Sequence, residues 1–194
     1  MKKIFIGTIL AFLNFSWSFD FNIFVDARWM SVEFIPTFIG YVLIALGAME
    51  LSGKNKNFKY AAMISPFAAA FSLYEFIRKL FGVSIYFIDT DTDMFSPLYL
   101  LYLAGTALCL TAFMLVVTGI AKMEKEDEND YNAVSLKNTA RIAVIANIFW
   151  QLPFGMPYYI YYTLVAIIII SALALIYQMY FTQRMYCEAN PKKQ

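Results

Sequence analysis

The sequence predicts an all-α integral membrane protein with six transmembrane helices, arranged as three helical hairpins that close on the outer side. Three observations carry this prediction: long segments without charge, a recurring proline motif, and a composition that is 61% hydrophobic and 15% charged. Soluble domains are closer to half apolar and a quarter charged. The apolar excess is therefore too large for one soluble core.

The segments without a charged residue place the helices. They are residues 4–19, 34–49, 60–74, 94–121 and 142–183. About 20 apolar residues are needed to cross the hydrocarbon core, so the last segment is long enough for two crossings, separated by the turn signal PFGMP. We expect helices near residues 3–24, 34–51, 60–81, 95–120, 134–153 and 157–181. Residues 122–132 are predicted to form an acidic cytoplasmic linker, and residues 182–194 a cytoplasmic tail.

The first of these helices has a second interpretation. The chain starts Met-Lys-Lys, continues with an apolar stretch, and has small Ser16 and Ser18 at positions suited to signal-peptide cleavage. Aromatic residues crowd that region, however, and the second helix needs a partner. We therefore keep a helix at 3–24 and leave cleavage of residues 1–18 open.

Positive charges predict the orientation of the chain. With the N-terminus inside, only Arg28, Arg78 and Lys79 of the 15 lysine and arginine residues lie outside. Such an excess of basic residues on one side marks the cytoplasmic face. We expect a multi-pass protein of the bacterial cytoplasmic membrane with both termini in the cytoplasm.

A proline motif recurs at intervals of about 60 residues, the kind of period that predicts a repeated unit. The copies read PTFIGY, PLYLLY and PYYIYY. Proline suits the first helical turn, where its missing N–H has no partner to lose. The motif predicts three equivalent hairpins, marked by Pro36, Tyr41, Pro97, Tyr102, Pro157 and Tyr162.

The segment EFIPTFIGYVLIALGAMELS resembles the second helix of a group of small uncharacterised multi-pass bacterial membrane proteins. These proteins share a Pro-x-Phe-Ile-Gly-Tyr-x-Leu-Ile-x-x-Gly helix. The matching residues here are Pro36, Phe38, Ile39, Gly40, Tyr41, Leu43, Ile44 and Gly47. The residue after the proline is often acidic in that group and is Thr37 here. The resemblance implies a multi-pass fold and brings no known activity.

Small residues predict where helices approach each other closely. Gly40 and Gly47 are seven residues apart and share one helix face, and alanines cluster around Pro66. In a bilayer, small residues let the backbones of neighbouring helices come together.

Several function classes are disfavoured. The net charge of +1 gives no reason to expect nucleic-acid binding, and the absence of histidine removes the usual general base and zinc ligand. Asp89, Asp91 and Asp93 begin like a calcium loop, but Met94 stands where such a loop needs glycine. Cys109 and Cys187 are predicted to be unpaired. We expect no catalytic set, no metal and no cofactor.

Four polar residues form the candidate ligand site. Glu75 ends an uncharged segment, and Arg78 and Lys79 follow it one turn later. A carboxylate at membrane depth marks a functional site or an interfacial ion pair, and the second is the simpler interpretation. Asn147 and Gln151 share a helix face and serve either helix packing or a ligand. The sharper hypothesis is that Asp20, Glu75, Asn147 and Gln151 line one outward-facing cavity for a small polar ligand.

Two functions remain open at this stage. The first is a small-solute-binding or transport component in the lipid bilayer, favoured by a compact apolar bundle with scattered polar residues. The second is a non-transporting scaffold or membrane partner subunit of a larger complex. A retained ligand favours the first, and a stoichiometric protein partner without ligand favours the second.

Overall fold

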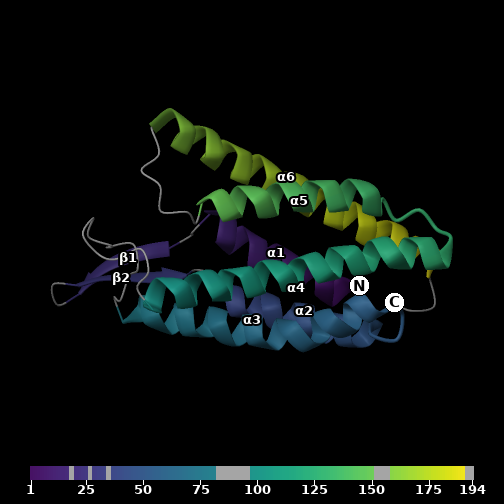
Figure 1. Ribbon diagram of the computed structural model, residues 1–194, viewed down its shortest axis with the longest axis horizontal. Helices are drawn as coiled ribbons and strands as arrows, with labels where there is room; N and C mark the ends of the chain where they lie inside the picture. The colour runs from purple at the N-terminus through teal and green to yellow at the C-terminus, as the bar shows by residue number, and fades with distance from the viewer. Residues whose placement is uncertain (18–19, 26–27, 34–35, 82–96, 151–157, 191–194) are drawn as a thin grey trace.

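The structure, a computed structural model, describes residues 1–17, 20–25, 28–33, 36–81, 97–150 and 158–190. Within these ranges, six helices and one antiparallel β-hairpin follow one another along the chain (Figure 1). The elements are α1 Lys2–Trp17, β1 Asp20–Val25, β2 Arg28–Glu33, α2 Thr37–Leu51, α3 Lys56–Leu80, α4 Pro97–Asp127, α5 Ala133–Trp150 and α6 Tyr158–Ala189.

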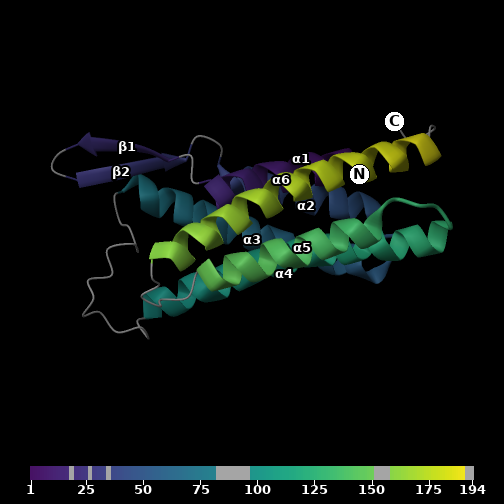
Figure 2. The ribbon, with the colours of Figure 1, turned by 90° about the horizontal axis from the view of Figure 1, so that it is seen from above.

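The helices form a closed ring. Each helix packs against the next one in the chain, and α6 returns to pack against α1 (Figure 2). Across the ring, the Phe12 and Phe113 side chains of α1 and α4 are in contact, with ring centroids 4.4 Å apart. The start of α1, the end of α6 and the connections 52–55 and 128–132 lie together at what we call the terminal end. The β-hairpin lies at the opposite, hairpin end (Figure 1).

The contact between α1 and α2 is made backbone to backbone. A Cβ atom on Gly40 would lie 2.5 Å from the Ala11 nitrogen and 2.7 Å from the Gly7 oxygen. A Cβ on Gly47 would lie 2.9 Å from the Ile4 nitrogen. No side chain fits between these main-chain atoms, so glycine is required for this approach. The structure confirms the close packing predicted from Gly40 and Gly47.

Helix α3 packs on α4 through small residues. Its first turn is capped by Asn55, whose Oδ1 accepts from the N–H groups of Asn57 (3.1 Å) and Phe58 (3.3 Å). The glycines of α4 receive aromatic rings from α3, with Phe71 lying on Gly105 and Phe58 on Gly119. The buried face of α3 consists of Phe58, Ala61, Ser65, Ala68, Ala69, Ser72, Glu75 and Arg78. Two charged residues thus continue a face that is otherwise small or apolar.

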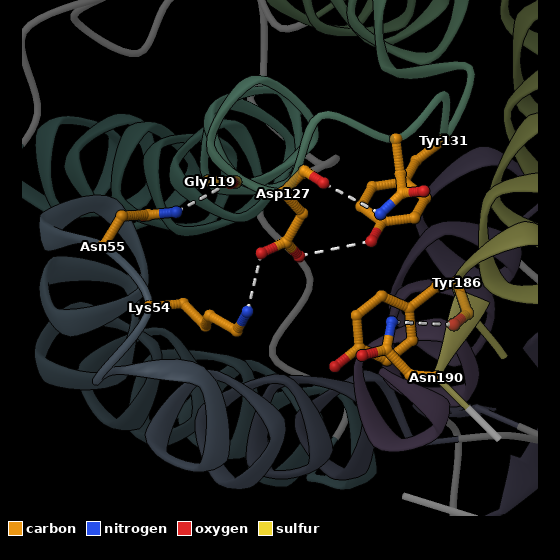
Figure 3. Close-up of polar contacts among 8 residues, drawn as sticks. Lys54, Asn55, Gly119, Asp127, Tyr131, Tyr186 and Asn190 are labelled. Carbon is orange, nitrogen blue, oxygen red and sulfur yellow. Dashed lines mark hydrogen bonds and ion pairs between the residues drawn. The ribbon is translucent and has the colours of Figure 1, made fainter. Parts of the chain in front are cut away.

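Polar contacts hold the terminal end together (Figure 3). Asp127, at the end of α4, accepts from Lys54 Nζ at 2.7 Å and from the Tyr131 hydroxyl at 3.2 Å. Asn55 Nδ2 donates to the Gly119 carbonyl at 2.9 Å. The hydrogen bond to Asp127 raises the pKa of Lys54 above its ordinary value. The connection before α3 is therefore tied to the end of α4.

Glu124 joins α4 to the start of α5. Its Oε2 accepts from the backbone N–H groups of Tyr131 at 2.7 Å and Ala133 at 2.8 Å. A carboxylate at this position satisfies N–H groups that have no partner inside the helix. The turn between the helices contains two residues with positive φ, Glu128 (52°) and Asn132 (60°). The short connection is thus fixed by its own backbone and by α4.

Several predicted boundaries need correction. The first helix was expected to reach residue 24, but α1 ends at Trp17 and Asp20 begins a strand whose Cα partner is Glu33. Residues 20–25 are rich in β-branched and aromatic residues, which favour strands, and Trp29 and Val32 add to this in the second strand. The predicted acidic linker at 122–132 is also partly helix, because α4 continues to Asp127. Similarly, α6 extends to Ala189, well into the predicted tail.

Two of the three repeated prolines lie at helix starts, whereas the three tyrosines differ in exposure. Pro36 directly precedes α2 and Pro97 is the first residue of α4; Pro157 lies outside the described residues. Tyr41 is buried, Tyr102 is half-buried and Tyr162 is 66% exposed. The three tyrosines therefore have different surroundings, and equivalence of the hairpins stays a prediction.

Three helical segments are long and apolar enough to cross a membrane. They are Lys56–Leu80, Tyr99–Asp127 and Tyr162–Ala189. Thr37–Leu51 is apolar but shorter. Large apolar side chains cover the outside of these helices, among them Phe67, Ile170 and Leu173, which are 68%, 67% and 52% exposed. An outer surface of this kind fits a lipid environment.

We predict that Gly40→Ala lowers the thermal unfolding midpoint of the purified protein. The added methyl group overpacks the α1–α2 contact, a change that costs about 1–3 kcal/mol. The matched control is Gly53→Ala, since a Cβ there meets nothing within 4 Å. Equal midpoints for the two variants would show that the backbone contact does not hold the helices.

A second prediction concerns the pair Lys54–Asp127. In a double-mutant cycle of Lys54→Met and Asp127→Asn, we expect a coupling of about 0.2–1 kcal/mol, the range for partly exposed pairs. Because the pKa of Lys54 is raised, the coupling is fully present below the ordinary lysine value of 10.5 and is lost as pH rises through the raised value. Urea unfolding at pH 8 measures the coupling, and urea unfolding at strongly alkaline pH measures its loss.

The pair Arg184–Glu188 is the control for this cycle. Its side chains are both 63% exposed, against 33% and 18% for Lys54 and Asp127. We expect a smaller coupling there. A coupling at Lys54–Asp127 no larger than the control would contradict a structural role for the terminal-end contacts.

Candidate functional site

A groove between α4 and α5 is the main candidate for a binding site. It has a volume of about 580 Å³. Its walls are formed by Leu103, Thr106, Ala107, Leu110, Thr111, Met114, Leu115 and Thr118 of α4 and by Val144 and Ile148 of α5. No charged residue belongs to this lining. Ligand pockets typically measure about 300–1,000 Å³ and are mostly apolar, so both size and lining fit a small organic molecule.

Two of the three threonines that line the groove use their hydroxyl groups within α4. The Thr111 hydroxyl donates to the Ala107 carbonyl at 2.7 Å, and the Thr118 hydroxyl donates to the Met114 carbonyl at 2.7 Å. Such bonds to the preceding helical turn are common for threonine in helices. With these donors already used, the groove presents mainly methyl and methylene groups to an occupant.

Helix α4 separates the groove from the packed part of the bundle. Cys109, Ala112 and Phe113 are buried in the core, whereas Ala107 and Thr111 are exposed to the groove. At the terminal end, the capping of α5 by Glu124 fixes the two helices to each other. The groove walls begin at Thr118, on the hairpin side of the Glu124 contacts, and continue along α4 to Leu103. The two helices are therefore joined at one end, with the groove along the rest of the contact.

Of the four predicted ligand residues, the three that the structure describes lie on three different elements. Asp20 begins β1, and Glu75 lies on the buried face of α3. Asn147 is 1% exposed on α5, and its Nδ2 donates to the Ala143 carbonyl at 2.7 Å. Gln151 lies outside the described residues. None of the other three belongs to the groove lining, although Asn147 is flanked in sequence by Val144 and Ile148, which do.

Glu75 forms a buried ion pair with Arg78. The distance from Arg78 Nη2 to Glu75 Oε2 is 2.6 Å, and the side chains are 6% and 12% exposed, respectively. Nearby on the same face, Ser72 Oγ lies 3.8 Å from Cys109 Sγ of α4. The pair thus sits inside the protein rather than on its surface. An ion pair was predicted for Glu75, but burial of Arg78 was not.

One feature of the sequence points to that burial. The small residues Ala61, Ser65, Ala68 and Ser72 recur at helical spacing, and extending this spacing by one turn reaches Glu75. The face that small residues bring close to α4 is therefore the face that carries the carboxylate. The α4–α5 groove has no comparable signal, because its lining resembles any apolar helix surface.

Metal binding finds no support in the described part of the chain. No group of three or more cysteine, aspartate or glutamate side chains is arranged to hold an ion there. Asp89, Asp91 and Asp93 lie outside that part. Cys109 and Cys187 are both free, with Cys109 buried.

The three long apolar helices fit a membrane protein that crosses the bilayer more than once. Comparison with protein-family models, with curated proteins and with solved structures gave no match.

Proposed function

We propose that the protein is a small-molecule-binding or transport component of the bacterial cytoplasmic membrane, with the α4–α5 groove as its binding site. The observation that supports this most directly is the groove itself, about 580 Å³ in volume and free of charged lining residues. An apolar groove of this size is the usual starting point for a hypothesis about function.

The ligand of this site is a largely apolar molecule. Placing an ion against walls of leucine, methionine and threonine methyl groups would cost several kcal/mol without a compensating partner. The Thr106 side chain is 5% exposed, and its hydroxyl makes no hydrogen bond to the described residues. Of the three lining threonines, it is therefore the best placed to orient one polar group. The ligand class is thus more apolar than the polar solute expected from Asp20, Glu75, Asn147 and Gln151.

All six helices cross the bilayer under this proposal, with the terminal end in the cytoplasm. The α2 helix has 15 residues and spans about 22 Å at ~1.5 Å per residue, less than the ~30 Å of hydrocarbon. Local thinning of the bilayer and flanking residues complete such a crossing. The cytoplasmic assignment rests on the lysines of the terminal end, including Lys2, Lys3 and Lys54.

We predict that Ala107→Phe empties the groove of its ligand. The phenyl ring fills space between α4 and α5 and competes sterically with an occupant. Gentle purification followed by native mass spectrometry should detect a bound small molecule in the unaltered protein and lose it in this variant. The control is Ala104→Phe, because Ala104 is exposed on α4 but is not part of the lining.

Loss of the molecule from both variants, or its retention in both, would argue against the groove as the binding site. A preparation that contains no small molecule but a stoichiometric membrane partner would support the alternative function, a scaffold or partner subunit.

The topology gives a separate prediction. A reporter fused after residue 56 or after residue 127 should report a cytoplasmic location. A reporter fused after residue 90 should report an external location. An external signal from the fusion at residue 56 would rule out the proposed orientation. A reporter fused after residue 150 tests whether α5 crosses the bilayer, in which case it should report an external location.

A further inference from the structure

The buried pair Glu75–Arg78 stands at the end of a helix face built for close packing. From Ala61 to Ser72, the buried residues of α3 are small, which lets α4 approach. In the last turns the same face carries a carboxylate and a guanidinium, both almost completely buried. Replacing such a pair with apolar residues is often neutral or stabilising. Packing alone therefore gives no reason for charges at this place.

The hydrogen-bonding of Arg78 is only partly used. Nη2 donates to Glu75 at 2.6 Å, whereas Nε and Nη1 are buried without a partner among the described residues. A guanidinium has five N–H groups, of which Nε carries one and Nη1 two. Leaving buried donors unsatisfied is costly, and more so on a charged group. Arg78 thus presents a set of strong donors from a position shielded from solvent.

We infer that Arg78 is the binding site for an oxyanion, a phosphate or carboxylate group, with Glu75 as its positioning residue. The planar donor fork of arginine matches the oxygens of these groups, and hydrogen bonds between charged partners are the strongest available. The low dielectric of a buried site strengthens them further. This inference does not depend on the α4–α5 groove, which lies on the other side of α4.

Glu75 has a second effect under this inference. Its carboxylate holds Arg78 by one nitrogen and also offsets the positive charge that attracts the ligand. A neutral residue of the same shape should therefore favour the anion. If the ion pair were only structural, Glu75→Gln would lower the stability of the protein and would not increase its response to an anion.

The oxyanion has two possible sources. Arg78 is three residues before Phe81, an aromatic residue that is 69% exposed at the end of α3. The proposed topology places this end of α3 near the headgroups, so the phosphodiester of a membrane lipid is one candidate. The same donors also suit a free anion such as inorganic phosphate.

The experiment measures thermal unfolding of the full chain in a neutral detergent. Inorganic phosphate is titrated in one arm and phosphatidylglycerol in the other, with chloride at matched ionic strength and phosphatidylcholine as references. We expect a rise of about 2–5 °C at saturation in at least one arm. Arg78→Gln should weaken the response at least tenfold in concentration, whereas the neighbouring Lys79→Gln should change it much less.

Glu75→Gln is the decisive variant, since we expect the anion to act at about tenfold lower concentration than in the unaltered protein. Arg78→Lys keeps the charge without the fork and should bind several-fold more weakly, which covers the case in which Arg78→Gln fails to fold. A response in the phosphate arm identifies a free anion, and one in the lipid arm alone identifies a headgroup. No response in either arm, or a Glu75→Gln variant that responds less than the unaltered protein, would overturn the inference.

Discussion

The backbone contact between α1 and α2 is the constraint on which the bundle depends. Lipid tails are as apolar as the helices, so the hydrophobic effect gives helices within a bilayer little reason to associate. Close packing of main-chain atoms at Gly7 and Gly40 provides van der Waals contacts that hold α1 and α2 together. Helix α1 also contacts α6 and, through Phe12, α4. A shift of α1 away from α2 would thus disturb these two further contacts and open the ring.

The two ends of the bundle are held by different forces. At the terminal end, Lys54, Glu124, Asp127 and Tyr131 connect α3, α4 and α5 through hydrogen bonds between side chains and loops. Along α4 toward the hairpin end, the helix faces small residues of α3 on one side and the groove on the other. Helix α4 is therefore both a packing surface and the wall of the groove.

Much of the architecture was predictable because charge-free segments and helix-starting prolines are local signals. The six helices follow from them, and the close packing at Gly40 and Gly47 follows from the spacing of these two small residues. The hairpin at Asp20–Glu33 was not predicted, because a polar, aromatic segment between helices also fits an irregular loop. The roles of Glu124 and Asp127 depend on partners in other elements, so their spacing suggested only a solvated linker. For the same reason, no local pattern revealed the groove or the unsatisfied donors of Arg78.

The hairpin has a consequence for how the protein sits in its membrane. A ribbon of two strands leaves one edge of each strand with N–H and C=O groups that have no partner in the ladder. Hydrocarbon offers no hydrogen bonds to these groups, so the proposed topology places strands β1 and β2 in water or among headgroups. The hairpin follows α1 closely and precedes α2 directly. Under the proposed six-span topology, the hairpin would therefore limit how deeply these two short helices enter the bilayer, and with them the glycine contact that they share.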